Sequence, residues 1–125
     1  MLKFNMGNEY NLWLKKAEQD LDTAKYNIEG RKFDAGLFFL QQAAEKSLKA
    51  LHIKKFRELF KTHDLVILAR KLKAPKNIED FCKELTLAYQ YTRYPDVSEG
   101  ENLENKAEQF LKYSKEVIKW VKENL

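Results

Sequence analysis

Gln41-Gln42-Ala43-Ala44-Glu45-Lys46-Ser47-Leu48-Lys49-Ala50 is the stretch that decides the fold. Its small and apolar residues recur at steps of three or four, which is typical of one face of an α-helix. Between them stand Gln41, Glu45 and Lys49, and polar groups close to a core need hydrogen-bonding partners. The stretch predicts a helix over Phe33–Phe56 that approaches its neighbours closely through small residues.

The rest of the chain also has helical periodicity. Glycine and proline together number only six, so we expect few turns and long elements. The chain is predicted to form one domain, residues 1–125, with an all-α, up-and-down antiparallel bundle of about five helices. Besides 33–56, we expect a helix over Asn8–Glu29 with Gly30 as its left-handed cap, and a short helix to Leu72 with Thr62 or Asp64 as its N-cap. A further helix should be capped by Asn77 and end near Thr92. The last helix should run from about Leu103 to Val121, after a capping box formed by Ser98 and Glu101.

Composition excludes several classes of protein. Hydrophobic residues make up 44% of the chain and charged residues 34%, as in a soluble globular domain. No apolar run reaches the ~20 residues that a membrane helix needs, so we expect a cytoplasmic protein that does not bind membranes. Cys82 stands alone and cannot form an internal disulfide. The histidines and this cysteine lack metal-ligand spacing, so we expect no metal and no cofactor.

Two residues are candidates for binding or chemistry. His63 lies where a helix begins, and a neutral imidazole there could accept a proton beside a bound anion; alternatively, His63 and Asp64 only cap that helix. Arg93 lies where a helix must end, and its guanidinium could bind a carboxylate or phosphate. The alternative for Arg93 is an internal salt bridge to Glu45 or Asp20.

The polar row Gln41, Glu45 and Lys49 has steps of four residues. Either it is an exposed face with a salt bridge between Glu45 and Lys49, or it is the floor of a polar cleft shared with His63 and Arg93. Basic residues also gather between Lys46 and Lys61, which suits phosphate, an acidic partner, or a solvated helix end.

Four motifs in order resemble the HEPN family. They are the stretch 41–50, Thr62-His63-Asp64-Leu65, Tyr89 with Arg93-Tyr94-Pro95-Asp96, and the helix-1 residues Trp13, Ala17, Asp20, Leu21 and Ala24. The resemblance implies a helical bundle that commonly forms homodimers and binds nucleotides. Many relatives are small prokaryotic proteins paired with a minimal nucleotidyltransferase, as two-component or toxin–antitoxin systems, and others are metal-independent ribonucleases that act on RNA.

The resemblance therefore leaves two functions open. The first is a module without catalytic activity of its own, which binds a nucleotide or a nucleotidyltransferase through Gln41, Glu45, Lys49, His63 and Arg93 and dimerises through apolar surface on its first, second or last helix. The second is an endoribonuclease that uses His63 with Arg93 or Arg57. The family's ribonucleases have an arginine followed closely by a histidine near the late helix. Here no histidine follows Arg93, and the pair Arg57 and His63 has that spacing earlier in the chain.

Overall fold

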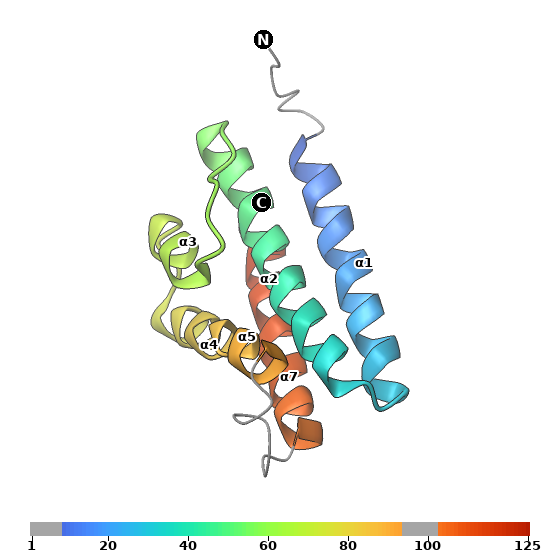
Figure 1. Ribbon diagram of the computed structural model, residues 1–125. Helices are drawn as coiled ribbons and strands as arrows, with labels where there is room; N and C mark the ends of the chain where they lie inside the picture. The colour runs from blue at the N-terminus through green and yellow to red at the C-terminus, as the bar shows by residue number, and fades with distance from the viewer. Residues whose placement is uncertain (1–8, 94–102) are drawn as a thin grey trace.

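The computed structural model describes residues 9–93 and 103–125 (Figure 1), without the side chains of Tyr89, Thr92 and Arg93. Asn8, Ser98 and Glu101 therefore lie outside the described residues. The described part folds into helices alone, which are α1 (Glu9–Glu29), α2 (Phe33–Phe56), α3 (Leu65–Lys71), α4 (Lys76–Thr86), α5 (Ala88–Arg93) and α7 (Leu103–Glu123).

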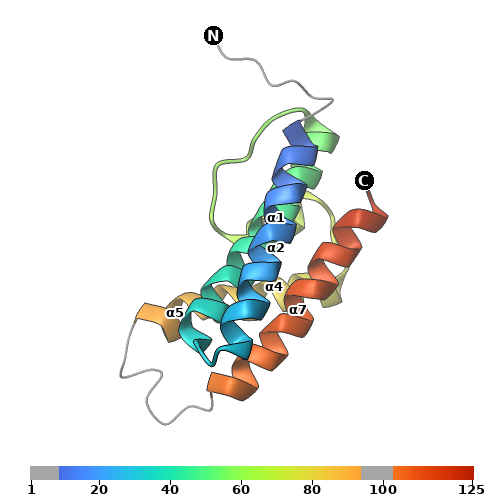
Figure 2. The same cartoon turned by 90° about the vertical axis from the view of Figure 1, so that its right-hand side faces the viewer.

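Helix α2 is the centre of the bundle. It packs against α1 on one side and α7 on another, while α3, α4 and α5 cover its remaining flank. Helix α1 runs antiparallel to both α2 and α7, as Figure 2 shows from the side. The all-α antiparallel bundle predicted from the sequence is thus confirmed, and helix Phe33–Phe56 has the predicted bounds.

Close packing of α1 and α2 depends on Gly36. A Cβ atom at this position would lie only 2.6 Å from Cγ1 of Ile28. Real Cβ contacts are longer than this, so glycine permits a separation between the helices that alanine would not. On the α7 side, the buried hydroxyl of Ser114 donates a hydrogen bond of 2.9 Å to the carbonyl of Leu40. Gly36 of α2 and Ser114 of α7 therefore serve close helix packing.

Two predicted caps are wrong. The left-handed residue after α1 is Arg31, with φ 62°, and not Gly30. Arg31 N–H bonds to Ile28 and Lys32 N–H to Asn27, the pair of bonds that places the left-handed residue second after the helix. Helix α4 begins after Pro75, which is its N-cap in an extended conformation with φ −65° and ψ 161°; Asn77 is a residue inside the helix.

The predicted helix from Asn77 to near Thr92 is also two helices and not one. Helix α4 ends at Thr86, whose hydroxyl bonds to the carbonyl of Cys82 at 2.9 Å. A hydroxyl that bonds to the backbone in this way competes with the helical ladder and can bend the chain. The apolar spacing continues across the break, with Leu85 and Ala88 both buried, so periodicity did not reveal it.

The core is continuous and contains Cys82. Its buried apolar side chains come from all six described helices, mostly from α2 and the faces that pack on it. Burial raises the pKa of the Cys82 thiol to about 12. No helix among the described residues is both long and apolar enough to cross a membrane.

Candidate functional site

The row of polar residues on α2 is buried at its centre. Glu45 is 3% exposed and Lys49 is 5% exposed. Lys49 Nζ lies 3.0 Å from Glu45 Oε2, and Gln41 donates a hydrogen bond of 3.3 Å to Glu45 Oε1. The interpretation of this row as an exposed, salt-bridged face is therefore wrong, because α1 and the segment after α2 cover it.

That segment, Arg57–Asp64, carries His63 back to the row, and we call it the strap. The strap leaves the end of α2 and runs back along that helix to α3 (Figure 1). His63 Nδ1 lies 3.1 Å from Glu45 Oε2, while the His63 side chain is 88% exposed. A carboxylate can only accept, so Nδ1 donates this bond and Nε2 is the ring nitrogen left for a ligand.

Asp64 ends the strap as the N-cap of α3. Its carboxylate accepts hydrogen bonds from the N–H groups of Val66 and Ile67. Asp64 N–H in turn donates to the hydroxyl of Thr62 at 3.1 Å. Of the two alternatives for His63 and Asp64, Asp64 is the cap and His63 bonds to α2 instead.

The α1 side of the row is closed by Trp13. Lys49 Nζ lies 5.7 Å from the centre of the Trp13 ring, within the range of a cation–π contact. The contacts therefore run without interruption from Trp13 through Lys49 and Glu45 to His63. They join the first helix of the chain to the strap across α2.

A second buried carboxylate lies next to this line of contacts. Asp20 on α1 forms ion pairs with Lys46 of α2 and with Lys16, the latter at 3.6 Å. The Asp20 side chain is 3% exposed, so its charge needs these cations. Both acids that the sequence offered as salt-bridge partners for Arg93 thus already have lysine partners, whereas the Arg93 side chain lies outside the described residues.

Comparison with known proteins identifies the family. A sequence model of the HEPN domain matches residues 10–124. The chain belongs to the HEPN family. Its fold is similar to that of TT1696 from Thermus thermophilus, with a TM-score of 0.82 and 26% identity over 94% of this chain and 99% of that one. It is also similar to ST0689, an archaeal HEPN homologue, with a TM-score of 0.76 and 28% identity over 98% and 97% of the two chains. No curated protein sequence matches significantly.

Within this HEPN domain, the structure unites four of the five predicted site residues. Gln41, Glu45, Lys49 and His63 form one hydrogen-bonded cluster. No group of three or more histidine, cysteine, aspartate or glutamate side chains in residues 9–93 and 103–125 could hold a metal ion. The cluster is therefore a polar site in which a buried ion pair supports one exposed imidazole.

Sequence reasoning missed His52 as part of this site. His52 follows Glu45 by seven residues, so it continues the same face of α2 by two further turns. It is fully buried, and its Nδ1 lies 2.8 Å from the carbonyl oxygen of Glu58 in the strap. The signal in the sequence is the polar row itself, which extends to this position.

Proposed function

We propose that this HEPN domain is a binding module without catalytic activity of its own, and that it engages a nucleotide or a nucleotidyltransferase partner around His63. The observation that carries this proposal is the exposed His63 ring held by the buried Glu45 carboxylate at 3.1 Å. An exposed imidazole that is already held by a hydrogen bond suits ligand recognition, because its side chain loses little conformational freedom when a ligand binds.

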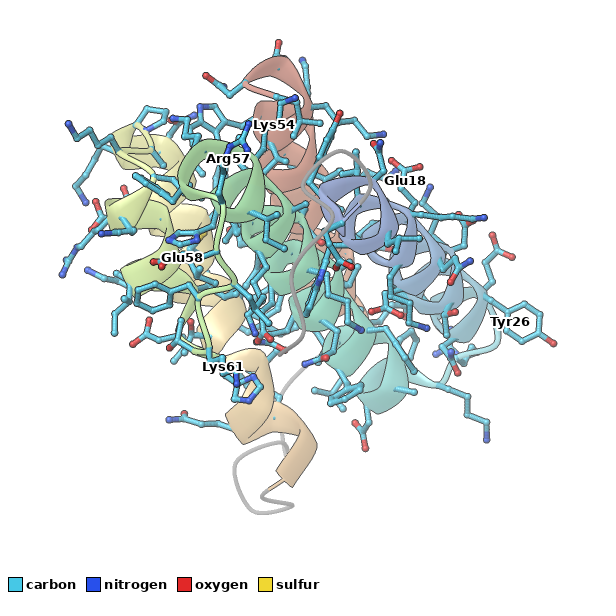
Figure 3. All side chains as sticks on the ribbon, turned by 90° about the horizontal axis from the view of Figure 1, so that it is seen from above. Glu18, Tyr26, Lys54, Arg57, Glu58 and Lys61 are labelled. Atoms are coloured by element: carbon cyan, nitrogen blue, oxygen red, sulfur yellow. The ribbon has the colours of Figure 1, made fainter. Side chains whose placement is uncertain are left out.

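The strap itself carries Arg57 and Lys61 against Glu58 and Asp64, and Lys54 and Lys55 just before it make this region positive, which supports an anionic ligand. Figure 3 views the bundle from the end of α2 and places Lys54 and Arg57 near that end and Lys61 further along the strap. No acidic side chain among the described residues pairs with Arg57 or Lys61, and both are exposed. Exposed cations on the segment that carries His63 attract phosphates or an acidic protein surface.

The test is calorimetric titration with ATP. We expect binding by the wild type and a loss of at least about tenfold in affinity for His63→Ala, which removes about 1.4 kcal/mol or more of binding free energy. Lys115→Ala on α7 is the matched control, since it removes an exposed cation far along the chain from the strap, and its affinity should equal that of the wild type.

A pull-down with the tagged chain tests the partner alternative. Recovery of a nucleotidyltransferase in near-equal amount with the wild type, and its loss with His63→Ala, would support the accessory-subunit role in a two-component or toxin–antitoxin system. Binding of neither ATP nor such a partner would contradict the proposal, as would equal binding by wild type and His63→Ala.

The endoribonuclease remains a second candidate because of one geometric feature. The Glu45 carboxylate holds the His63 Nδ1–H, which leaves Nε2 free as a general base for a ribose hydroxyl. As in the hypothesis from the sequence, Arg93 or Arg57 would bind the phosphate. This candidate predicts RNA cleavage in EDTA that His63→Ala abolishes while the melting temperature is unchanged; cleavage that persists in the variant would exclude His63.

A further inference from the structure

Beyond the capping bond from Arg57 N–H to the Ile53 carbonyl, the strap is hydrogen-bonded to side chains of α2 at two points. His52 bonds to the carbonyl of Glu58 at 2.8 Å, and Glu45 bonds to His63 at 3.1 Å. Seven residues separate the two α2 positions, which is a distance of about 10 Å along a helix. The strap therefore runs antiparallel to the second half of α2, with one bond near each end.

Chain length alone does not place His63. The five steps along the chain from Glu58 to His63 could span about 17 Å if fully extended, well beyond the separation of the two α2 positions. Within the strap, the N–H of Thr62 bonds to the carbonyl of Phe60 at 3.0 Å, which shortens the segment locally. The slack means that His63 could take other positions, so contacts along the strap must place it.

The His52 ring has a defined hydrogen-bonding state. A carbonyl oxygen can only accept, so Nδ1 carries the proton that is donated to Glu58. The other nitrogen, Nε2, is buried and has no partner among the described residues. The rings of Phe56 and Phe60 lie 4.7 and 5.3 Å from the imidazole, centre to centre. The described surroundings of this histidine are thus largely apolar.

An unpartnered buried nitrogen is unfavourable, and an apolar side chain would avoid it. What a histidine adds at this position over a phenylalanine of similar shape is a single donor aimed at the strap. The two other polar contacts of the row, Gln41 and Lys49, both bond to Glu45 itself. His52 is the member of the α2 row that bonds to the strap backbone.

We propose that His52 is a positioning residue for the binding site at His63. Its Nδ1–H fixes the Glu58 carbonyl, and this attachment sets the path of the strap that brings His63 to Glu45. The proposal rests on the proposed function in one respect: His52 affects ligand binding only because His63 is the ligand contact. The attachment itself is a separate claim with its own readout.

Two substitutions separate the hydrogen bond from the packing. His52→Asn places an amide nitrogen where Nδ1 stands and keeps the donor, but it empties the rest of the ring volume. His52→Phe fills the volume and removes the donor. If His52 acts through its hydrogen bond, the asparagine variant keeps the hydrogen bond between His63 and Glu45, and the phenylalanine variant breaks it. If His52 acts by packing alone, the phenylalanine variant keeps the hydrogen bond between His63 and Glu45, and the asparagine variant breaks it.

Nuclear magnetic resonance supplies the first readout, and it does not depend on a ligand. In the wild type, long-range proton–nitrogen spectra should show His52 protonated at Nδ1 and not at Nε2. In His52→Phe, the His63 ring nitrogens should shift toward values for free histidine, and amide exchange over residues 58–63 should accelerate at least about tenfold. His52→Asn should stay close to the wild type in both measurements.

Affinity for ATP supplies the second readout, with His52→Phe expected to bind at least about tenfold more weakly than His52→Asn. Three results would each overturn the proposal: a His52 proton on Nε2, an intact His63–Glu45 hydrogen bond in folded His52→Phe, or a broken one in folded His52→Asn. If the wild type binds no ATP, the proposed function fails on that ligand, while the resonance measurements still decide the role of His52.

Discussion

The exposed imidazole of His63 is bonded to the buried carboxylate of Glu45, at 3.1 Å from Nδ1 to Oε2. The same oxygen, Oε2, receives Lys49 at 3.0 Å. One atom thus joins a surface group available to ligands with an ion pair inside the bundle. Changes at Glu45 should consequently affect both the position of His63 and the free energy of unfolding.

The first prediction concerns the buried ion pair. Glu45→Gln should lower the free energy of unfolding by about 3–5 kcal/mol, because it leaves the Lys49 cation in the interior without an anion. Urea denaturation followed by circular dichroism measures this loss. Glu18→Gln is the matched control, since it breaks an ion pair with Lys122 whose two side chains are about half exposed, and it should cost at most about 1 kcal/mol.

The double variant Glu45→Gln/Lys49→Met tests the cause of that loss. Replacing the cation by an apolar side chain of similar length removes the unpaired charge, so more than half of the lost stability should return. Equal losses in the single and the double variant would show that the charge on Lys49 is not the source of the destabilisation.

The helices were predictable because their signals are local. Phe33–Phe56 was correct at both ends, since the apolar periodicity begins and stops there in the sequence. The break at Thr86 was not visible, because Leu85 and Ala88 continue the apolar spacing across it. Periodicity reports which face is buried, and it does not report whether the backbone ladder is continuous.

The site was predictable only in part, because some of its contacts join residues that are far apart in the sequence. Gln41, Glu45 and Lys49 share a face by helical spacing, so their proximity follows from the sequence. Their burial does not, because it depends on α1 and the strap lying over them. The contact between Glu45 and His63 crosses eighteen residues, and the His52–Glu58 bond depends on how the strap folds back.

The second prediction compares the two expected caps. Asp64→Ala removes a carboxylate that accepts two backbone N–H groups of α3, so it should lower the free energy of unfolding by about 0.5–2 kcal/mol. Asn77→Ala should be neutral or slightly stabilising, because Asn77 lies inside α4 and alanine is the better helix former. Thermal denaturation of both variants measures the difference, and a larger loss for Asn77→Ala would contradict the assignment of both caps.

The third prediction concerns the contact between α1 and α2. Gly36→Ala should be destabilising by about 1–2 kcal/mol, because overpacking against Ile28 exceeds the gain in helix propensity. In an Ile28→Ala background the clash is gone, so the same substitution should stabilise the protein by up to about 1 kcal/mol. This reversal of sign is measured by a double-mutant cycle in urea. Gly36→Ala with the same effect in both backgrounds would exclude Ile28 as the obstacle.

The last prediction follows from the buried thiol. Burial raises the pKa of Cys82 to about 12, whereas the same thiol in the unfolded chain titrates near pH 9. Between these values the unfolded chain has lost the proton and the folded chain keeps it. The unfolded state then binds fewer protons, so stability falls as pH rises, by up to about 1.4 kcal/mol per unit.

Urea denaturation at pH 8.5 and pH 10.5 tests this dependence, with Cys82→Val as the reference. Lysines also titrate in this range, but they do so in both proteins, so the difference between wild type and variant isolates the thiol. We expect the wild type to lose about 2 kcal/mol more than Cys82→Val over the interval. The folded wild type should also resist an aromatic disulfide reagent at pH 8 until urea unfolds it, because the reactive thiolate is scarce and buried. Fast modification without urea would show that Cys82 is accessible and that its pKa is not raised.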